Sequence, residues 1–415
     1  MSIPGLGQIP TQPTASTTRV ITLRPACEWR FQASSPVIVK LLSGTAEKDG
    51  VELGPKNAYT FAGVKSKILT WHGCELEIDG RCDVDSVAEY ANPTDNPANV
   101  HVNLHGQLND MRQKAAREGR EGPRVLIVGP ADVGKTTVAR TLTSYATRQG
   151  YQPLVVNANP KEGLLSLPGT LSASVLATVM DIEAVDGWGS TPTSGPSSVP
   201  VKLPLVFYYG LASPDEDPEF YRELMSKLAG SVSARLSEDE DVKSSGVIID
   251  GMGLPEQSKD GNERTSLGEP ISIVPIDKSD GVVIRDEAFL QHVREAAIKE
   301  YFFGDSKRTL SPLIQQVDFD SVIVYHTSDE NSHSQGVTRE DPSTPMQHWT
   351  FAIMHATPKE SPDTVRAASV MGFLYVSDVD EERRKIKLLS PVSGRLGDQP
   401  LVWGKWPEPF INLLG

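Results

Sequence analysis

A glycine-rich run near the middle of the chain has the residue types and the spacing that bind phosphate groups. Residues 129–136 have the sequence GPADVGKT, which fits the pattern G-x-x-x-x-G-K-[ST] at every fixed position. In such a loop the glycines let backbone N–H groups turn toward phosphate oxygens. The lysine reaches the β- and γ-phosphates, and the Thr136 hydroxyl binds Mg²⁺. The run therefore predicts a binding site for a nucleoside triphosphate with its Mg²⁺ ion.

The segments on either side of this run are those that a phosphate-binding loop requires. Residues 124–128 (RVLIV) form an aliphatic run that is typical of a buried strand. A helix is expected after the loop, because Val138, Leu142 and Ala146 would share one face and Gly150 is a stop signal. The positive end of this helix would face the phosphates. The alternative is a glycine-rich turn that fits the pattern by chance, and chance does not supply the strand and the helix as well.

An aspartate at the end of another aliphatic run is a second candidate for chemistry. Asp250 closes the segment GVIID, residues 246–250. An acidic residue that ends a buried strand beside a phosphate-binding loop can hold Mg²⁺. A strand-end aspartate can equally cap the turn that follows it. Both interpretations of Asp250 remain open at the level of the sequence.

Further aliphatic runs predict an α/β domain around the loop. Strands are expected at residues 153–158, 203–208, 246–250 and 271–276, and a helix is expected at residues 219–236. Strands that alternate with helices form a doubly wound, mostly parallel sheet. The nucleotide would then lie at the carboxyl ends of the strands.

The pattern differs on the two sides of this α/β region and indicates separate domains. Residues 1–18 are rich in Pro, Ser, Thr and Gly and predict a disordered tail. Short alternating runs with turn residues between them predict an N-terminal β-sandwich-like domain at residues 19–100. The P-loop ATP-binding domain would span residues 101–310. Residues 311–415 lack the strand–helix alternation and predict a C-terminal β-rich domain.

Two further features concern the ends of the P-loop domain. A helix is expected at residues 100–121, and its charged run at residues 112–120 is interpreted as a solvated face. In the C-terminal domain, strands are expected at residues 317–325, 349–356, 370–377 and 385–391.

The composition narrows the range of partners. The 415 residues carry a formal net charge of −14, which argues against broad, nonspecific nucleic-acid binding, although a local basic groove is compatible with it. Cys27, Cys74 and Cys82 have no metal-ligand spacing and are interpreted as reduced thiols of the cytosol or nucleus. No segment has the length and apolarity of a signal peptide or a membrane span, so a soluble intracellular protein is expected.

Five short runs, taken together and in order, carry a resemblance to a known family. They are TWHGC at residues 70–74, VGPADVGKTT at 128–137, SLPGT at 166–170, EYFFG at 300–304 and PLVWGKW at 400–406. Over nearly its whole length the chain resembles the RNA 5′-hydroxyl kinase family. Within that family it is similar to the Clp-type ATP-binding subunits of the pre-mRNA cleavage and polyadenylation factor, in a fungal-like form.

The resemblance implies a site shared by two domains. The N-terminal β-domain would pack on the P-loop domain and hold the nucleoside end of ATP. Glu28 takes the place of a glutamate near the base, and Lys65 takes the place of a lysine; without the resemblance both would be interpreted as surface charges, and that alternative remains. The resemblance assigns the phosphates to Gly129, Asp132, Val133, Gly134, Lys135, Thr136 and Thr137, with Thr136 also as the Mg²⁺ ligand.

The chain departs from the active kinases of the family where catalysis would need specific groups. The active kinases carry an Asp and a Gln at the end of the second strand, whereas this chain has Asn159 and Glu162. An asparagine carries no charge, so Asn159 would not act as a base toward a 5′-hydroxyl. The active kinases also place an aromatic residue, which stacks on RNA, where this chain has Leu254.

A second departure lies on the lid helix that precedes the EYFFG run. Arg294 matches an arginine of the active kinases, but two other expected arginines are Ala297 and Lys299. Lysine lacks the planar fork of arginine. An arginine that stabilises the transition state is worth about 10³–10⁵ in kcat in the GTPases where it has been assessed. Altered together, these features predict a loss of phosphoryl transfer.

The sequence thus favours an ATP-binding, catalytically inactive scaffold subunit of the mRNA 3′-end cleavage and polyadenylation machinery, in the nucleus. Its partners would be protein subunits of that factor, with RNA contact indirect or weak and no membrane. The first alternative is an active ATP-dependent RNA 5′-hydroxyl kinase, which the intact Lys135 and Thr136 favour. The second is a slow ATPase or GTPase switch, and the lack of an N-K-x-D motif counts against GTP.

Overall fold

The computed structural model shows two compact units within the part of the chain that it describes. One unit runs to Lys48 and from Glu52 to Pro93, and the other comprises Asp49–Val51 and Thr94–Gly415. The described residues are 18–183, 204–253, 272–278, 285–304, 309–327, 337–394 and 396–414. The expected disordered tail lies outside this range except for its last residue, and Leu254 lies outside it as well.

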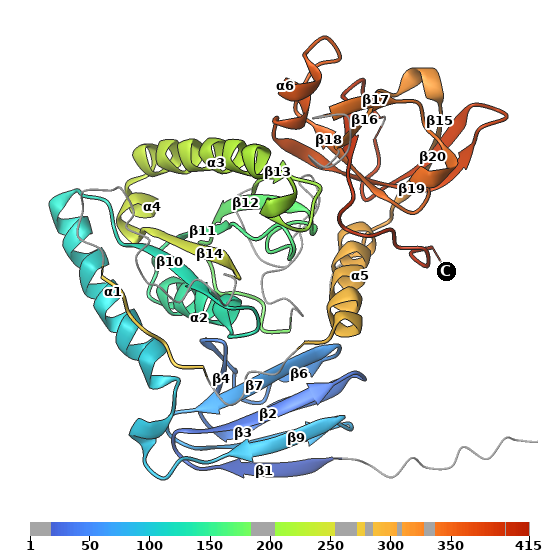
Figure 1. Ribbon diagram of the computed structural model, residues 1–415. Helices are drawn as coiled ribbons and strands as arrows, with labels where there is room; N and C mark the ends of the chain where they lie inside the picture. The colour runs from blue at the N-terminus through green and yellow to red at the C-terminus, as the bar shows by residue number, and fades with distance from the viewer. Residues whose placement is uncertain are drawn as a thin grey trace, which may run out of the picture. The chain divides into compact units, whose positions relative to one another are not determined.

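The first unit consists of two antiparallel sheets that pack face to face (Figure 1). Phe31 of one sheet contacts Phe61 of the other, with ring centroids 5.6 Å apart. Both rings and Trp29 are buried, as the alternation of apolar residues along these strands predicts. The strand orders are β1-β8-β3-β6 and β5-β4-β7-β2-β9. The predicted sandwich-like domain is confirmed.

The strands of this unit follow the alternating runs of the sequence, with three additions. β4, β5 and β9 were not predicted, because the first two have only two residues each and the third is exposed along most of its length. The strands are β1 (Arg19–Leu23), β2 (Cys27–Ala33), β3 (Val37–Gly44), β4 (Glu47–Lys48), β5 (Val51–Glu52), β6 (Ala58–Phe61), β7 (Val64–Thr70), β8 (Cys74–Asp79) and β9 (Val84–Ala88).

The P-loop domain is built on a five-stranded sheet with the order β10-β14-β11-β12-β13. β10, β14 and β11 are parallel, whereas β12 and β13 are antiparallel additions. The described sheet is therefore mixed rather than mostly parallel. The strands are β10 (Arg124–Gly129), β11 (Leu154–Asn157), β12 (Thr170–Val175), β13 (Leu205–Tyr208) and β14 (Val247–Gly253).

One strand prediction for this sheet was wrong, and one strand of the sheet was not predicted. Residues 272–276 of the strand expected at 271–276 are irregular, and they include the strongly exposed Ile273. The sequence did not predict β12, because its alternating Ser and Thr residues lower its apparent hydrophobicity. These polar residues are buried on one face of the sheet, while Leu171, Ala173 and Val175 pack on the other.

Helices cover both faces of the sheet (Figure 1). α2 (Lys135–Arg148) lies on the face toward which Ile248 and Asp250 of β14 point, and α3 (Pro218–Glu238) lies on the opposite face. The apolar stripe of α3 packs on alternate residues of β11, β12 and β14. Polar residues at the strand ends therefore lie on the face that α2 covers, close to the phosphate-binding loop that precedes α2.

The helix expected at residues 100–121 is α1 (Asn99–Glu118). Its charged run is only partly a solvated face, because Arg112 is 1% exposed while Arg117 and Arg120 are exposed. Arg112 Nε donates a hydrogen bond to Ser245 O, 2.9 Å away, at the carboxyl end of α4 (Glu240–Ser245). A cation is favourable beside these carbonyl groups.

The C-terminal domain is a seven-stranded sheet with the order β15-β20-β19-β18-β21-β16-β17. The strand expected at residues 317–325 is wrong as a single element, because a 3-10 turn (Phe319–Ser321) interrupts it. The strands are β15 (Leu313–Asp318), β16 (Val324–Thr327), β17 (Val337–Glu340), β18 (Thr350–Met354), β19 (Val370–Asp380), β20 (Lys385–Ser390) and β21 (Leu401–Trp403). The remaining helices are α5 (Glu287–Phe303) and α6 (Pro362–Arg366), with 3-10 turns at Pro93–Asp95, Pro214–Glu216 and Thr344–Met346.

One hydrophobic core joins the C-terminal domain to the P-loop domain. It combines Tyr301 and Phe302 of α5 with Tyr208 of β13 and with Phe373 and Tyr375 of β19. These rings meet edge to face, with centroid distances of 5.1–6.2 Å. The two domains therefore belong to one compact unit. Among the described helices, none is long and apolar enough to cross a membrane.

Candidate functional site

The phosphate-binding loop connects β10 to α2 with a backbone that is shaped for an anion. Gly134 is the N-cap of α2 and has φ = 88°, a left-handed conformation that favours glycine. Asp132 is also left-handed, with φ = 50°. Among the residues that the structure describes, no side chain caps the first turn of α2, so its N–H groups can bind an anion. This geometry fits the role predicted for Gly134 and for the residues that follow it.

Lys135 lies across the loop that contains it. Its Nζ donates a hydrogen bond to Pro130 O at 2.7 Å. Burial lowers the pKa of Lys135, although Asp250 and Glu162 nearby act in the opposite direction. The ammonium group of Lys135 is partly removed from water and has carboxylates nearby. A phosphate group could replace these carboxylates as its negatively charged partner.

Thr136 and Asp250 meet where Mg²⁺ would be expected. Thr136 Oγ1 donates to Asp250 Oδ2 at 2.6 Å, across 114 residues of sequence. Asp250 is 2% exposed, and its Oδ1 has no hydrogen-bond partner among the described residues. Burial raises the pKa of Asp250 to about 6. A hydroxyl and a carboxylate oxygen are ligands that Mg²⁺ prefers, so these residues fit the ion.

This contact bears on the two interpretations of Asp250. The one side-chain hydrogen bond of Asp250 that the described residues show runs to the loop helix and not to the turn after β14. A carboxylate that is buried with one oxygen unpaired carries a desolvation cost that a cation would offset. The geometry therefore favours Asp250 as a Mg²⁺ residue over Asp250 as a turn cap.

A polar row extends sideways from Asp250 across the sheet. Asp250, Asn157 and Ser172 stand directly opposite one another on β14, β11 and β12, and all three are buried. Asn157 Nδ2 donates to Glu162 O at 3.1 Å, and its Oδ1 accepts from Asn159 N at 2.9 Å. Asn157 thereby fixes the loop that carries Asn159 and Glu162 beside the phosphate-binding loop.

Arg285 joins the site although the sequence did not reveal it. Its Nε donates to Asp132 Oδ1 at 2.8 Å, and its Nη1 and Nη2 donate to the two Glu162 oxygens at 3.1 and 2.9 Å. The predicted phosphate residue Asp132 is thus ion-paired here. The resemblance points to arginines on the lid helix, whereas Arg285 precedes α5 by two residues; an arginine just before a lid helix is the signal that could have found it.

The lid-helix residues lie elsewhere than the resemblance implies. The Arg294 guanidinium is bound by Glu408 of the C-terminal segment and by Glu287, at 2.6 and 2.7 Å. Ala297 is partly buried, and Lys299 is exposed. Among the described arginines, Arg285 contacts the phosphate-binding loop, whereas the contacts of Arg294 are to α5 and the C-terminal segment.

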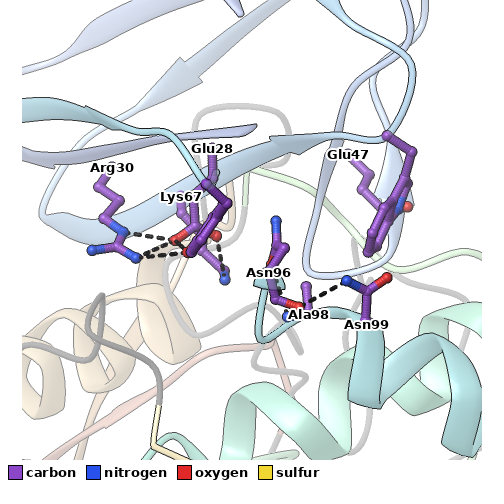
Figure 2. Close-up of polar contacts among 9 residues, drawn as sticks. Glu28, Arg30, Glu47, Lys67, Asn96, Ala98 and Asn99 are labelled. Carbon is purple, nitrogen blue, oxygen red and sulfur yellow. Dashed lines mark hydrogen bonds and ion pairs between the residues drawn. The ribbon is translucent and has the colours of Figure 1, made fainter. Parts of the chain in front are cut away.

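Glu28 and Lys65 belong to the other compact unit. Glu28 is fully buried, and its carboxylate is paired with Arg30 and Lys67 at 2.6 Å each (Figure 2). Burial alone would raise the pKa of Glu28, but Lys67 and Arg30 outweigh it and hold the pKa below its ordinary value. Glu28 is therefore not a surface charge. Lys65 stands opposite Gln32, on the same face of the β2–β7 pair as Glu28.

Comparison with protein families covers all three parts of the chain. Residues 22–115 match the N-terminal beta-sandwich domain of polyadenylation factor, residues 129–260 match the mRNA cleavage and polyadenylation factor CLP1 P-loop, and residues 310–408 match the pre-mRNA cleavage complex II protein Clp1. A mRNA cleavage and polyadenylation factor CLP1 of Pyricularia oryzae is 48% identical, and the match covers 100% of both chains. The chain belongs to the Clp1 family.

Other Clp1 proteins support the same assignment. The mRNA cleavage and polyadenylation factor of Botryotinia fuckeliana is 42% identical over the full length of both chains. Among solved structures, wild-type Clp1p in complex with Pcf11p (454–563) has a TM-score of 0.83 at 28% identity, covering 94% of this chain and 97% of that one. A second structure, also with a TM-score of 0.83, concerns an extended Pcf11p–Clp1p interface and ATP loss in a glycine-to-arginine point mutant. The predicted resemblance is confirmed, and so is the predicted fold class of an α/β P-loop domain between two β-rich domains, except that the sheet of the P-loop domain is mixed.

Three other runs that carry the resemblance, EYFFG, SLPGT and PLVWGKW, have structural roles. Tyr301 and Phe302 of the EYFFG run belong to the core shared by the P-loop and C-terminal domains. Gly169 of the SLPGT run has φ = +87°, and a Cβ there would lie 2.6 Å from Trp406 O. The SLPGT and PLVWGKW runs therefore meet where only a glycine leaves enough room.

Proposed function

We propose that this Clp1-family chain binds ATP with Mg²⁺ through its phosphate-binding loop and does not transfer the γ-phosphate. The observation that carries the proposal of binding is the Thr136–Asp250 pair beside a complete loop, with one buried Asp250 oxygen left for a cation. The phosphates would contact Gly129 and residues 132–137, with Thr136 and Asp250 at Mg²⁺. Glu28 and Lys65 would serve the nucleoside end. The loss of ATP in a point mutant of the solved relative supports ATP as the nucleotide.

The side chains around the loop support binding without transfer. Asn159 is neutral, and its Oδ1 accepts a hydrogen bond from Lys161 N at 3.1 Å. It therefore shapes its own loop and offers no base. Arg294, which the active kinases would place at the γ-phosphate, is held by two glutamates of the protein itself. The site would clamp the nucleotide without the groups that stabilise a moving phosphoryl group.

A bound nucleotide that is not consumed would act as part of the fold. A ligand that binds only the folded form stabilises it by about 4 kcal/mol at a thousandfold excess over Kd. The stabilised surface would receive protein subunits of the nuclear cleavage and polyadenylation factor, since solved relatives are complexes with Pcf11p. The net charge of −14 suits a protein partner better than direct RNA binding.

The loss of the loop lysine tests this proposal. Lys135→Ala should lower the nucleotide content of the purified protein, lower its Tm and weaken capture of a Pcf11-type fragment, because all three depend on the same bound ATP. Lys243→Ala is the matched control, because Lys243 pairs with Glu240 on α4 outside the site. Unchanged nucleotide content, Tm and capture in Lys135→Ala would contradict the proposal.

An active RNA 5′-hydroxyl kinase is the second candidate. The intact Lys135 and the Thr136–Asp250 pair favour it, because both would also serve phosphoryl transfer. The two candidates differ in one respect, since the kinase must pass the γ-phosphate to RNA and the scaffold must keep it. A direct transfer measurement therefore separates them.

A further inference from the structure

The C-terminal segment contacts the lid helix, α5, through the buried side chain of Arg294. Arg294 of α5 is 6% exposed, and its Nε lies 2.9 and 3.0 Å from the two Glu408 oxygens, with its Nη2 2.6 Å from Oε1. Its guanidinium carbon stands 4.6 Å from the centre of the Trp406 ring. A charge-assisted pair and a cation–π contact act on the same group. We call Arg294, Trp406 and Glu408 the Trp406 clamp.

The Trp406 clamp reaches the first turn of the helix as well. Arg294 Nη2 also donates to Glu287 Oε1 at 2.7 Å, two helical turns before it. Glu287 follows Arg285 by two residues, and Arg285 binds Asp132 and Glu162 at the phosphate-binding loop. The backbone that carries Arg285 is therefore tied to Glu408 through a single guanidinium.

Trp406 also contacts the loop that carries Glu162, one of the two residues with which Arg285 pairs. Trp406 Nε1 donates to Lys161 O at 3.2 Å, and Lys161 directly precedes Glu162. Glu162 accepts two hydrogen bonds from Arg285. The Trp406 clamp thus contacts both α5, which begins two residues after Arg285, and the loop that carries Glu162.

The backbone of Trp406 is hydrogen-bonded to residues at the edge of the P-loop sheet. The backbone N–H of Trp406 donates to Gly210 O at 3.0 Å, and the backbone carbonyl of Trp406 accepts from Tyr208 Oη at 3.2 Å. The close approach of Gly169 leaves no space between the two segments. A segment fixed at its backbone in this way can transmit a displacement of the C-terminal domain to α5.

We propose that the Trp406 clamp positions Arg285 at the phosphate-binding loop, so that the affinity for nucleotide depends on the C-terminal domain. This inference rests on the proposed binding of ATP. Arg285 pairs with both Asp132 and Glu162 and offsets one of the two negative charges that these carboxylates place beside the phosphate-binding loop. Removing that cation would weaken ATP binding by about tenfold, the order expected for partly exposed charges a few ångströms apart.

The test is a double-mutant cycle on the full-length protein. The Kd of a fluorescent ATP analogue with Mg²⁺ is measured for the wild type, Arg285→Ala, Glu408→Gln and the double variant. Glu408→Gln keeps the side-chain shape and removes the charge that holds Arg294. It should weaken binding about threefold to tenfold, and the double variant should bind no more weakly than Arg285→Ala alone. Effects that multiply in the double variant would overturn the proposal.

One further variant of the Trp406 clamp and one control variant complete the test. Trp406→Phe retains the ring and removes the hydrogen bond to Lys161, so it should weaken nucleotide binding in the same direction. Arg366→Ala is the matched control, because Arg366 also stands over an aromatic ring, 3.9 Å from Phe220, and pairs with Asp217, yet it contacts α3 and not α5. It should lower Tm without changing the Kd. Equal losses of nucleotide affinity in Arg366→Ala and Glu408→Gln would overturn the proposal.

The cycle also separates this inference from the proposed function. A wild type that does not bind the nucleotide would contradict both. A wild type that binds, with affinity lost in Arg285→Ala and kept in Glu408→Gln and Trp406→Phe, would leave ATP binding intact and overturn the role of the Trp406 clamp.

Discussion

One buried oxygen of Asp250 lowers the stability of the protein without nucleotide and would favour the binding of Mg²⁺. Its Oδ2 accepts from Thr136, while its Oδ1 has no hydrogen-bond partner among the described residues. Burial raises its pKa to about 6, so at pH 7 its ionised form is held against a desolvation penalty. A Mg²⁺ ion would remove that penalty. Stability without nucleotide and binding of Mg²⁺ therefore make opposite demands on this residue.

Asp250→Asn should separate these two demands. Without nucleotide, the variant should be as stable as the wild type or more stable by about 1 kcal/mol, because a neutral amide is buried at lower cost. With nucleotide, it should lose the Mg²⁺-dependent part of the affinity. Urea unfolding at pH 7 and nucleotide titrations with and without Mg²⁺ check both statements.

Asp241→Asn on the exposed surface of α4 provides the control for the change of charge. A variant Asp250→Asn that is strongly destabilised without nucleotide, or that keeps its full Mg²⁺ dependence, would show that Asp250 has a structural role and no part in ion binding.

At the scale of the site, the local part could be predicted from the sequence and the long-range part could not. Residues 124–150 carry the strand, loop and helix signals together, so the phosphate-binding loop is evident without tertiary contacts. Arg285 enters through ion pairs to Asp132 and Glu162, more than 120 residues away in sequence. No periodicity marks such a residue. Arg294 is the expected residue type at the expected position in the sequence, and only the structure shows its pairing with Glu408.

At the scale of single elements, the same distinction separates the strands and helices. β10, α2 and α3 follow patterns that are strong within their own lengths, but β10 is an edge strand, and its Leu126 and Val128 are exposed where a buried strand was predicted. β12 does not, because half of its residues are Ser or Thr and its burial comes from neighbours on both sides. α1 was predicted, but its contacts were not, since Arg112 is buried against the end of α4.

The buried polar face of α1 leads to a prediction for stability in acid. The His105 ring lies tilted against the Tyr145 ring, with centroids 5.2 Å apart, and burial, with help from Arg112 and Arg148, lowers the pKa of His105 to about 4. Below pH 6.5 the unfolded chain would gain a proton that the folded chain does not accept, so stability should fall as the pH drops from 6.5 toward 4. Because His105 is only half-buried, its share should be about 1 kcal/mol.

The variant His105→Asn isolates this share, because asparagine does not titrate. Urea unfolding at pH 5 and pH 7 should show a smaller loss of stability in acid for the variant than for the wild type. If both proteins lose the same stability between these pH values, the acid sensitivity of the folded protein does not come from His105.

At the scale of the whole molecule, the C-terminal domain is an integral part of the unit that carries the phosphate-binding loop. The aromatic core around Tyr301 and the pairing of Arg294 with Glu408 both join it to the P-loop domain. The sequence predicted the β-rich character of this domain but not this union, because the contacts join residues that no local pattern relates.

The most direct test of the proposed function measures phosphate transfer from γ-labelled ATP to an RNA oligonucleotide with a 5′-hydroxyl end. The preparation is first shown to hold nucleotide, and Lys135→Ala serves as the control. We expect no labelled RNA above that control, because Asn159 offers no base and Arg294 is held away by Glu287 and Glu408. Labelled RNA with the wild type that vanishes with Lys135→Ala would contradict the proposed scaffold role and establish an enzyme.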